Sequence, residues 1–357
     1  MLNSHRLWPA VKGAAAILLG SICAVAQVPA DIEAGLLKIG QIVDPACTAV
    51  LYRPLMPAND INTNVTPLYP GVELTRDVAF GPDPRDVADI FVPDKGASSR
   101  TVLIFIPGGN GSRIERQNRE SNAFYDNVGR WGAEQGMVVL NMQRHPGKEW
   151  DDPGRDVSRI IQWTQANISK YKGNPNRIFV WAHSSGNVPL GMYIGRPELW
   201  GASGVGVKGA IFMSGQFNIA PLEIPGATNL PAPNEPGGQF YGAGKACGFV
   251  PPAGRGGPPP APAPADPTTL VARSSLPEFR KTKVKLMFAT AELDPFIKGA
   301  MSPFFQVLHD DICKNNPSNC PAMLYAKGES HLSEMFGLDT NDQTVARPVL
   351  DWIKKIK

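Results

Sequence analysis

The stretch RIFVWAHSSGN, residues 177–187, constrains the fold most, because an apolar strand-like run passes through a sharp turn directly into a helix-like segment. Ser184 lies at this turn, with the small residues Ala182 and Gly186 two positions before and after it. Small residues there let the backbone bend sharply, and the serine hydroxyl then projects outward. Ser184 is therefore a candidate nucleophile. The five-residue pattern alone also occurs in ordinary turns, so the rest of the sequence must support it.

Strand-like runs alternate with helix-like segments along most of the chain. The runs before residue 108 follow one another between turn residues, which predicts an antiparallel entry into a sheet. Continuous apolar strands between amphipathic helices then predict an α/β fold, with a mostly parallel sheet covered by helices on both faces. The predicted strands are 47–52, 72–80, 86–93, 101–107, 136–142, 177–182, 209–214, 283–290 and 322–326, and the predicted helices are 121–135, 156–171, a segment from 186, 295–314 and 342–355.

The alternation is interrupted at residues 221–267, which hold 13 of the 35 prolines of the chain and many of its glycines. Such a composition forms neither a regular strand nor a long helix, so this stretch is an insertion. Two interpretations stay open: a cap or lid at the mouth of a pocket, or a flexible excursion without substrate contact. Because strands resume afterwards, we predict one catalytic domain over 73–357, preceded by an N-terminal extension over 27–72.

Residues 1–26 have the pattern of a secretory signal peptide. Arg6 and Lys12 precede a short apolar run that closes in small residues, so we expect cleavage after Ala26 and export to the periplasm or the exterior. The apolar run is shorter than the roughly 20 residues that span a bilayer, so no stable membrane span is expected in the mature chain. Cys23 would also permit a lipid anchor, but the bulky residue before it makes this the second choice.

Removal of residues 1–26 would leave Cys47, Cys247, Cys313 and Cys320, an even number in an oxidising compartment. We predict that Cys313 pairs with Cys320, because the loop CKNNPSNC is short and rich in turn residues. Whether Cys47 and Cys247 also pair stays open, since two buried free thiols are an equally good interpretation. None of the four has the spacing to a histidine that is typical of a metal site, so none is predicted.

Charge argues against several partner classes. The chain has 35 Lys and Arg against 32 Asp and Glu, a formal net charge of +3, and these charges are dispersed. A nucleic-acid groove or a polybasic membrane patch would require a concentrated basic segment, so no nucleic-acid partner is expected. No G-x-x-x-x-G-K-[ST] phosphate loop is present, and no cofactor is predicted.

A reacting Ser184 requires a base within hydrogen-bond reach, because a serine hydroxyl is unreactive at neutral pH. His331 is the preferred base, since it lies in a turn-rich loop after the last predicted strand. The other four histidines lie in the predicted signal peptide, next to the nucleophile but pointing away, within a helix, or after an earlier strand: His5, His183, His309 and His145.

The group that orients this base should lie between Ser184 and His331 and also beyond a strand end. Asp294 follows the strand 283–290 directly and is our preferred acid, with Glu292 as the runner-up. Asp294 also precedes a proline, so a role as a turn or helix-start residue stays open beside the acid role.

An oxyanion site requires backbone N–H groups that a ligand can approach closely. The predicted strand 101–107 runs into a glycine-rich segment, and we predict the site over Gly108, Gly109 and Asn110, with the last two as the main donors. The amide of Ser185, which follows the nucleophile, would complete it.

These elements, in this order, resemble the α/β-hydrolase superfamily, and within it the hormone-sensitive-lipase-like and feruloyl-esterase-like carboxylesterases. DDPGRDVSRIIQWTQANISKYKGNPNRIFVWAHSSGN is similar to that group's helix, G-x-P-x-R-I turn, strand and elbow, and ELDPFIKG is similar to its acid loop. The resemblance covers about residues 73–357 and implies an α/β-hydrolase fold with Ser184 as nucleophile, Asp294 as acid and His331 as base. Pro107 stands where the group's H-G-G-G element has histidine, so something else must orient this loop.

We therefore predict an exported serine hydrolase that cleaves small-molecule or polymeric carboxylic esters through an acyl-serine intermediate. An amidase or peptidase of the same fold is the first alternative, because it would use the same three residues. A non-catalytic binding protein on this fold is the second. Enzymes with an aspartate nucleophile at the elbow are disfavoured by Ser184. The acyl and alcohol specificity depends on the insertion 221–267 and on the loop carrying His145, which periodicity does not fold.

Overall fold

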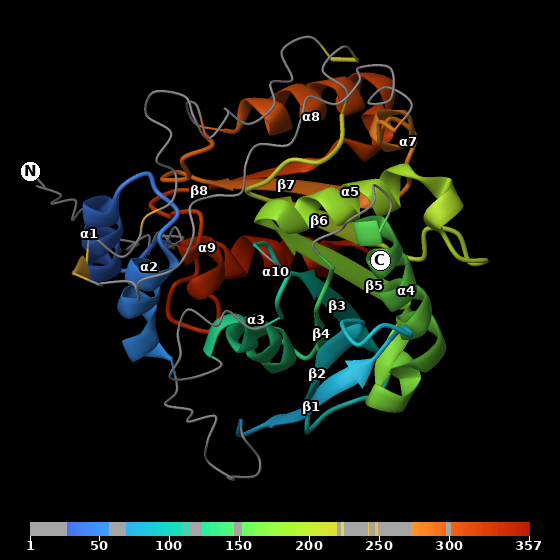
Figure 1. Ribbon diagram of the computed structural model, residues 1–357, viewed down its shortest axis with the longest axis horizontal. Coiled ribbons are helices and arrows are strands. Elements are labelled where there is room, and N and C mark those ends of the chain that lie inside the picture. The colour runs from blue at the N-terminus through green and yellow to red at the C-terminus, as the bar shows by residue number, and fades with distance from the viewer. Residues whose placement is uncertain are drawn as a thin grey trace, which may run out of the picture.

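The computed structural model describes residues 27–56, 69–109, 111–113, 123–145, 152–219, 223–224, 242, 247–248, 273–297 and 301–357. Eight strands of this part of the chain form one sheet in the order β1-β2-β4-β3-β5-β6-β7-β8 (Figure 1). The strands are β1 (Val72–Ala79), β2 (Val87–Pro93), β3 (Arg100–Ile106), β4 (Val138–Met142), β5 (Gly173–His183), β6 (Gly209–Met213), β7 (Lys285–Ala291) and β8 (Ala322–Ala326).

The strand directions confirm a mostly parallel sheet with an antiparallel entry. β2 runs antiparallel to both of its neighbours, β1 and β4. Every neighbouring pair from β4 to β8 is parallel. Because the carboxyl ends of parallel strands lie at the same edge of a sheet, the loops after β3, β5, β7 and β8 are brought together there.

Helices cover both faces of the sheet, as the alternation predicts. One hydrophobic cluster packs the sheet against α4 (Asp152–Asn167), α5 (Asn187–Gly195), α7 (Leu276–Phe279) and α8 (Pro303–Asn315). The opposite cluster packs it against α1 (Ala30–Ile39), α2 (Pro45–Tyr52), α3 (Ala123–Glu134), α9 (Ser333–Phe336) and α10 (Ala346–Lys355). Short 3-10 turns lie at η1 (Arg53–Leu55), η2 (Ile168–Tyr171), η3 (Ser184–Gly186), η4 (Pro197–Leu199) and η6 (Pro317–Asn319).

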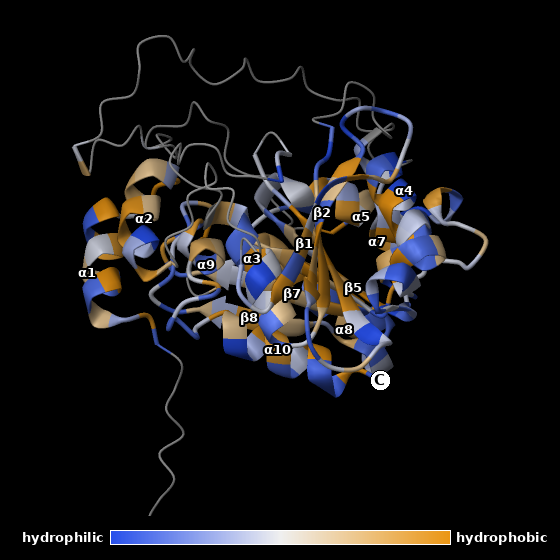
Figure 2. Ribbon diagram, turned by 90° about the horizontal axis from the view of Figure 1, so that it is seen from below, coloured by the Kyte–Doolittle hydropathy of each residue, from blue (hydrophilic) through white to orange (hydrophobic). Residues whose placement is uncertain are grey.

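The middle of β3, residues 102–106, is apolar at every position because both of its faces are buried. In β3, Val102, Ile104 and Ile106 point into the cluster with α4 and α5. Leu103 and Phe105 point into the opposite cluster, and all five side chains are fully buried. The hydropathy view shows the same arrangement, with apolar strands in the centre of the molecule (Figure 2).

One predicted strand is a helix, and several predicted bounds differ from those observed: α4 begins four residues before 156, and β5 begins four residues before 177. The run 47–52, predicted as a strand, lies in α2, where Pro45 opens the helix and the Asp44 side chain accepts the N–H of Cys47 at 3.1 Å. A short apolar run suits a buried helix as well as a strand, and capping decides here. α8 begins at Pro303 instead of 295, and α10 begins four residues later than 342.

The N-terminal extension packs beside the helix that follows the last strand, and a disulfide joins it to the insertion. The Tyr52 hydroxyl of α2 donates to Asp342 at 3.0 Å and lies 3.4 Å from Glu329. Cys47 forms a disulfide with Cys247, which resolves the pairing that the sequence left open. The predicted disulfide between Cys313 and Cys320 is present as well.

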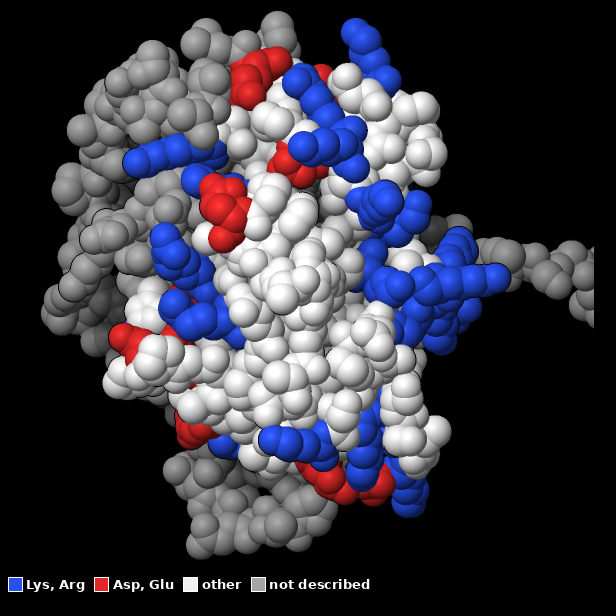
Figure 3. Space-filling model, turned by 90° about the vertical axis from the view of Figure 1, so that its right-hand side faces the viewer, with Lys and Arg blue, Asp and Glu red and all other residues white. Residues whose placement is uncertain are grey.

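The predicted signal peptide, including Ala26 and Cys23, lies outside the described residues, as does most of the insertion 221–267. Among the described helices, none combines the length and apolar character needed to cross a membrane. On the face shown in Figure 3, uncharged side chains occupy the middle, and basic side chains gather along one side.

Candidate active site

Ser184 lies at a sharp turn where β5 passes through η3 into α5. Its φ of 54° is in the left-handed region, which is strained for a residue with a side chain. The turn also leaves no room for larger neighbours: a Cβ on Gly186 would lie 2.5 Å from the carbonyl oxygen of Ile106. Ala182 is fully buried in the core two residues earlier. The steric demands of the predicted elbow are therefore met with alanine at its first position.

The structure brings Ser184, His331 and Asp294 together from three loops at the carboxyl edge of the sheet. The Ser184 Oγ lies 2.9 Å from His331 Nε2. On the other side of the ring, His331 Nδ1 lies 2.8 Å from Asp294 Oδ2. A carboxylate only accepts hydrogen bonds, so Nδ1 carries the proton and Nε2 is free to accept from the serine hydroxyl. Both His331 and Asp294 are only 2% exposed.

Asp294 is fixed by its own turn. Its Oδ1 accepts the N–H of Phe296 at 2.9 Å, and its carbonyl oxygen accepts the N–H of Ile297 at 3.1 Å. The turn interpretation of Asp294 therefore applies, and the helix predicted from 295 starts later, at Pro303; the acid role stays a prediction that the contact with His331 fits. Glu292, the runner-up, instead accepts the N–H of Gly328 at 2.7 Å.

A second buried histidine supports the loop of the first. The Nε2 of His183 lies 2.7 Å from the carbonyl oxygen of His331 and 3.1 Å from Glu334 Oε1. Burial, and then the neighbouring His331, hold the pKa of His183 well below its usual range, so the ring is neutral and donates from Nε2. Sequence reasoning placed His183 away from the nucleophile, but it missed this contact with the base.

Glu334 completes this buried group beside His331 and His183. Burial, followed by the charge of Asp294, raises the pKa of Glu334 well above its usual range. Its side chain is about 1% exposed, and this burial favours the protonated, neutral form of the acid. The only sequence signal was its position three residues after His331, which puts both on the same short segment.

The glycine-rich loop lies directly against Ser184. A Cβ on Gly108 would lie 2.7 Å from the Cβ of Ser184, so only glycine fits there. Gly109 has a φ of +54°, and its carbonyl oxygen accepts the Ser185 hydroxyl at 3.1 Å. Asn110 lies outside the described residues. The amide donors at Gly108, Gly109, Asn110 and Ser185 remain predictions.

A small hollow lies beside Asp294, between the loops that follow β6 and β7. It offers mixed polar and apolar surface next to the acid. Its lining residues are Ser214, Gly215, Gln216, Thr290, Asp294, Phe296, Ile297 and Ser302.

Two groups in the described part of the chain have ligand atoms close enough together to hold a metal ion: His183 with His331 and Glu334, and Asp86 with His145 and Asp156. In the first group, His331 uses both ring nitrogens for Asp294 and Ser184. In the second, Arg159 pairs with both carboxylates. These contacts fit side-chain networks better than an open metal site.

Comparisons with known proteins agree with this architecture. A family model described as BD-FAE matches residues 88–190, which run from β2 into α5. The isoprenylcysteine alpha-carbonyl methylesterase of Arabidopsis thaliana is 26% identical over 123 residues, 32% of this chain and 26% of that protein. Esterase LipC of Mycobacterium tuberculosis is 34% identical over 120 residues, 31% of this chain and 27% of that protein. The chain thus spans about a quarter of the length of these curated relatives.

Solved structures extend the likeness to most of the chain. A truncated carbohydrate esterase from gut microbiota has a TM-score of 0.52 at 13% identity, covering 84% of this chain and 98% of that one. Native esterase 2 of Thermogutta terrifontis has a TM-score of 0.52 at 14% identity, covering 80% and 92%. At these identities the likeness concerns the fold, and it agrees with the strand order. The chain therefore has an α/β-hydrolase fold, and the proteins that it resembles include esterases.

Proposed function

We propose that this protein is a serine esterase that hydrolyses carboxylic esters through a covalent acyl-serine at Ser184. The observation that carries the proposal is the hydrogen-bonded series from Ser184 through His331 to Asp294, at 2.9 and 2.8 Å. A nucleophile, a base and a buried acid in this order are what acyl transfer requires. The esterase relatives support ester hydrolysis as the reaction.

In this mechanism, His331 Nε2 removes the hydroxyl proton as the Ser184 oxygen attacks the ester carbonyl. Asp294 stabilises the imidazolium that forms, and backbone N–H groups of the glycine loop and of Ser185 stabilise the oxyanion. His331 then gives its proton to the leaving alcohol as the ester C–O bond breaks. Water, deprotonated by the same ring, attacks the acyl-serine and releases the acid.

The test uses a panel of p-nitrophenyl esters of increasing chain length, together with aryl and polymeric esters. Ser184→Ala should lower turnover by about 10⁴- to 10⁶-fold while leaving the fold intact. Ser318→Ala, at an exposed position in η6, serves as the control and should keep wild-type turnover. Full esterase activity in Ser184→Ala would refute the proposal.

Separate replacement of the two candidate acids tests the third member. Asp294→Asn should cause a large loss because it removes the negative charge that stabilises the imidazolium, and its amide can hold the His331 ring in the wrong tautomer. Glu292→Gln, which changes the partner of the Gly328 amide and of Tyr325 but leaves the contact between Asp294 and His331 in place, should retain most of the activity. The reverse result would assign the acid to Glu292.

An amidase or peptidase would use the same three residues. Rates on matched ester and amide substrates discriminate between them, and a higher turnover of the amide would favour the alternative. A non-catalytic binding protein would leave Ser184 unlabelled by an organophosphonate probe, whereas an esterase becomes labelled on that serine.

Export belongs to the same proposal. The two disulfides are supporting features, because such bonds persist in oxidising compartments. Fractionation of cells that express the full chain, followed by N-terminal sequencing, should find the mature protein outside the cytoplasm and beginning after Ala26. A cytoplasmic protein that retains residues 1–26 would contradict export.

A further inference from the structure

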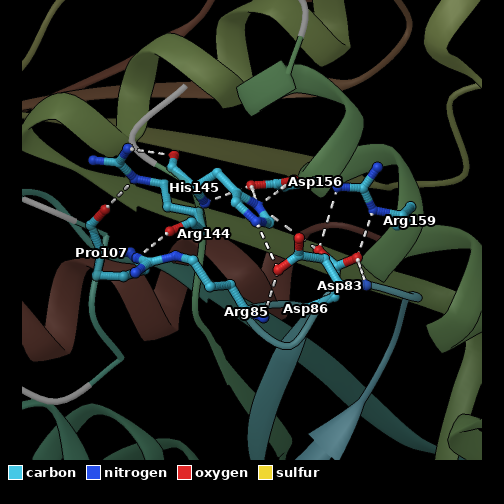
Figure 4. A network of polar contacts seen from close by, with 8 residues as sticks. All are labelled: Asp83, Arg85, Asp86, Pro107, Arg144, His145, Asp156 and Arg159. Carbon is cyan, nitrogen blue, oxygen red and sulfur yellow. Dashed lines mark hydrogen bonds and ion pairs between the residues drawn. The ribbon is translucent and has the colours of Figure 1, made fainter. Parts of the chain in front are cut away.

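The loop that carries the predicted oxyanion donors has Pro107 where the resembled family has histidine. A buried side chain from the loop after β4, a neighbour of β3, is instead hydrogen-bonded to its backbone. Arg144 follows β4 by two residues and is 4% exposed. Its Nε donates to the carbonyl oxygen of Pro107 at 3.0 Å, as Figure 4 shows. Its Nη2 donates to the carbonyl oxygen of Gly109 at 3.0 Å and to the Ser185 hydroxyl at 2.7 Å. One guanidinium thus joins the loop to the residue after the nucleophile.

These contacts determine the direction of the loop amides. In a trans peptide the C=O and N–H groups point in opposite directions. Arg144 holds the carbonyl of Pro107, which turns the N–H of Gly108 to the other side. The carbonyl oxygen of Gly108 accepts the N–H of Gly111 at 3.0 Å. This contact turns the N–H of Gly109 to the side opposite that carbonyl. The carbonyl of Gly111 in turn accepts the main-chain N–H of Arg144 at 3.0 Å, so Arg144 holds both ends of the loop.

Arg144 is itself held rigidly by its surroundings. Its carbonyl oxygen accepts Nη2 of Arg85 at 3.0 Å. The N–H of the next residue, His145, donates to Asp156 at 2.6 Å, and the ring of His145 lies between Asp156 and Asp83 (Figure 4). These backbone contacts at Arg144 and His145 fix the main chain, so the position from which the Arg144 side chain extends is fixed as well.

The guanidinium remains charged despite its burial. Desolvation lowers the pKa of Arg144 to about 10, a shift that the carboxylate of Asp156 partly opposes. A buried charge is tolerated only when its donors are satisfied, and here those donors bind backbone carbonyls and a hydroxyl. A planar fork of five donors on three nitrogens can reach acceptors that lie apart, whereas the three donors of a lysine ammonium share one nitrogen.

We infer that Arg144 is a positioning residue for oxyanion stabilisation: it takes the place of the missing histidine by orienting the amides of Gly108 and Gly109 toward the reacting carbonyl at Ser184. This inference rests on the proposed esterase function. Arg144 touches no reacting atom, so its removal should affect the transition state more than ester binding.

The experiment compares Arg144→Ala and Arg144→Lys with Arg100→Ala. Arg100 is a matched control because it is also buried, at 8% exposed, and donates to the backbone carbonyls of Pro93 and Lys95, but it lies at the opposite end of β3. Arg144→Ala should lower kcat for p-nitrophenyl acetate about 10²-fold with little change in KM. Arg100→Ala, compared per folded molecule after thermal melting, should keep the wild-type kcat.

Added guanidinium ion should restore part of the activity of Arg144→Ala and none of that of Arg144→Lys, in which the ammonium occupies the space. A merely structural role would not produce this rescue. A folded Arg144→Ala or Arg144→Lys with wild-type kcat would overturn the inference. So would a loss of kcat in Arg144→Ala that guanidinium does not restore and that Arg100→Ala shows as well. If instead the wild-type enzyme hydrolyses no ester and resists organophosphonate labelling, the proposed function fails first. If Arg144→Ala does not fold, Arg144→Lys alone decides through its kcat.

Discussion

At the scale of single residues, the strained turn at Ser184 depends on the absence of side chains around it. A Cβ at Gly108 would contact the Cβ of Ser184 and, at 3.1 Å, the carbonyl oxygen of His183. Overpacking of this kind costs about 1–3 kcal/mol and moves the backbone. The nucleophile and the predicted oxyanion donors would therefore shift together.

Gly108→Ala should consequently lose both stability and turnover. We expect kcat on p-nitrophenyl acetate to fall about 10²-fold or more, because an error of about 1 Å in the site has that effect. Gly204→Ala is the control for backbone strain: its φ of +72° strains alanine, but it has open space around it, whereas Gly108 has no positive φ and its Cβ would be crowded. Kinetics and denaturant melts of both variants separate strain from crowding. A fully active Gly108→Ala would contradict the close approach.

Glu334 gives a second prediction at this scale, concerning pH. The folded-state pKa of this acid is raised above its unfolded value, so its contribution to stability is complete below the unfolded pKa of about 4.3 and is lost as pH rises through the folded value. Glu334→Gln retains a neutral side chain of the same size. The unfolding free energy of wild type should therefore fall relative to that of the variant as pH rises above about 4.3. Denaturant melts between pH 4 and 8 measure it, and a constant difference would contradict a protonated Glu334.

At the scale of elements, the loop that carries His331 is held by α2. The Tyr52 hydroxyl of α2 bonds Asp342 and lies near Glu329, two residues before His331. Burial, and then the charge of Asp342, raise the pKa of Glu329 well above its usual range. The N-terminal extension therefore contacts a buried acid pair that borders the candidate site.

Tyr52→Phe removes the hydroxyl that contacts this acid pair and keeps the aromatic ring. The unfolding free energy should fall by about 1–3 kcal/mol, because buried acceptors lose a partner, and kcat should fall as the His331 loop loosens. Tyr193→Phe is a matched control, since its buried hydroxyl bonds the carbonyl of Val205 at 2.9 Å on the opposite face of the sheet. Equal kcat losses in both variants would show that Tyr52 has no particular effect on the base.

The elements also show what the sequence could predict. Fully apolar strands such as 102–106 were readable, because burial on both faces leaves a continuous pattern. The helix over 47–52 could not be predicted, since it depends on the cap at Asp44 and on packing against the rest of the fold. The contact of Ser184, Asp294 and His331 followed from strand order, because all three follow parallel strands. The contacts of Arg144 did not, since they depend on the path of a loop between non-adjacent segments.

At the scale of the whole molecule, the two disulfides close loops of very different size. Cys47 and Cys247 are 200 residues apart, whereas Cys313 and Cys320 are separated by 7. The N–H of Gly242 also donates to the carbonyl of Val43 at 2.9 Å, so this part of the insertion is attached to the N-terminal extension. The pairing was open in the sequence because it depends on where the insertion returns to the fold.

Chain-entropy arguments predict how much each disulfide stabilises the protein. The entropy that the crosslink removes from the unfolded chain should stabilise the folded protein by about 5 kcal/mol for the long loop and about 2 kcal/mol for the short one. The double variant Cys47→Ser with Cys247→Ser should therefore melt well below Cys313→Ser with Cys320→Ser, and both below wild type. Calorimetry under non-reducing conditions measures the order, and added reductant should lower wild type below both.

The same pair of double variants separates stability from substrate access. If the insertion shapes the mouth of the site, releasing Cys247 should change the ratio of kcat/KM between long-chain and short-chain p-nitrophenyl esters at a temperature where both variants are folded. Breaking the short loop between Cys313 and Cys320, which closes the end of α8, should leave this ratio unchanged. An unchanged ratio in both variants would mean that the tether holds the insertion without influencing the choice of ester.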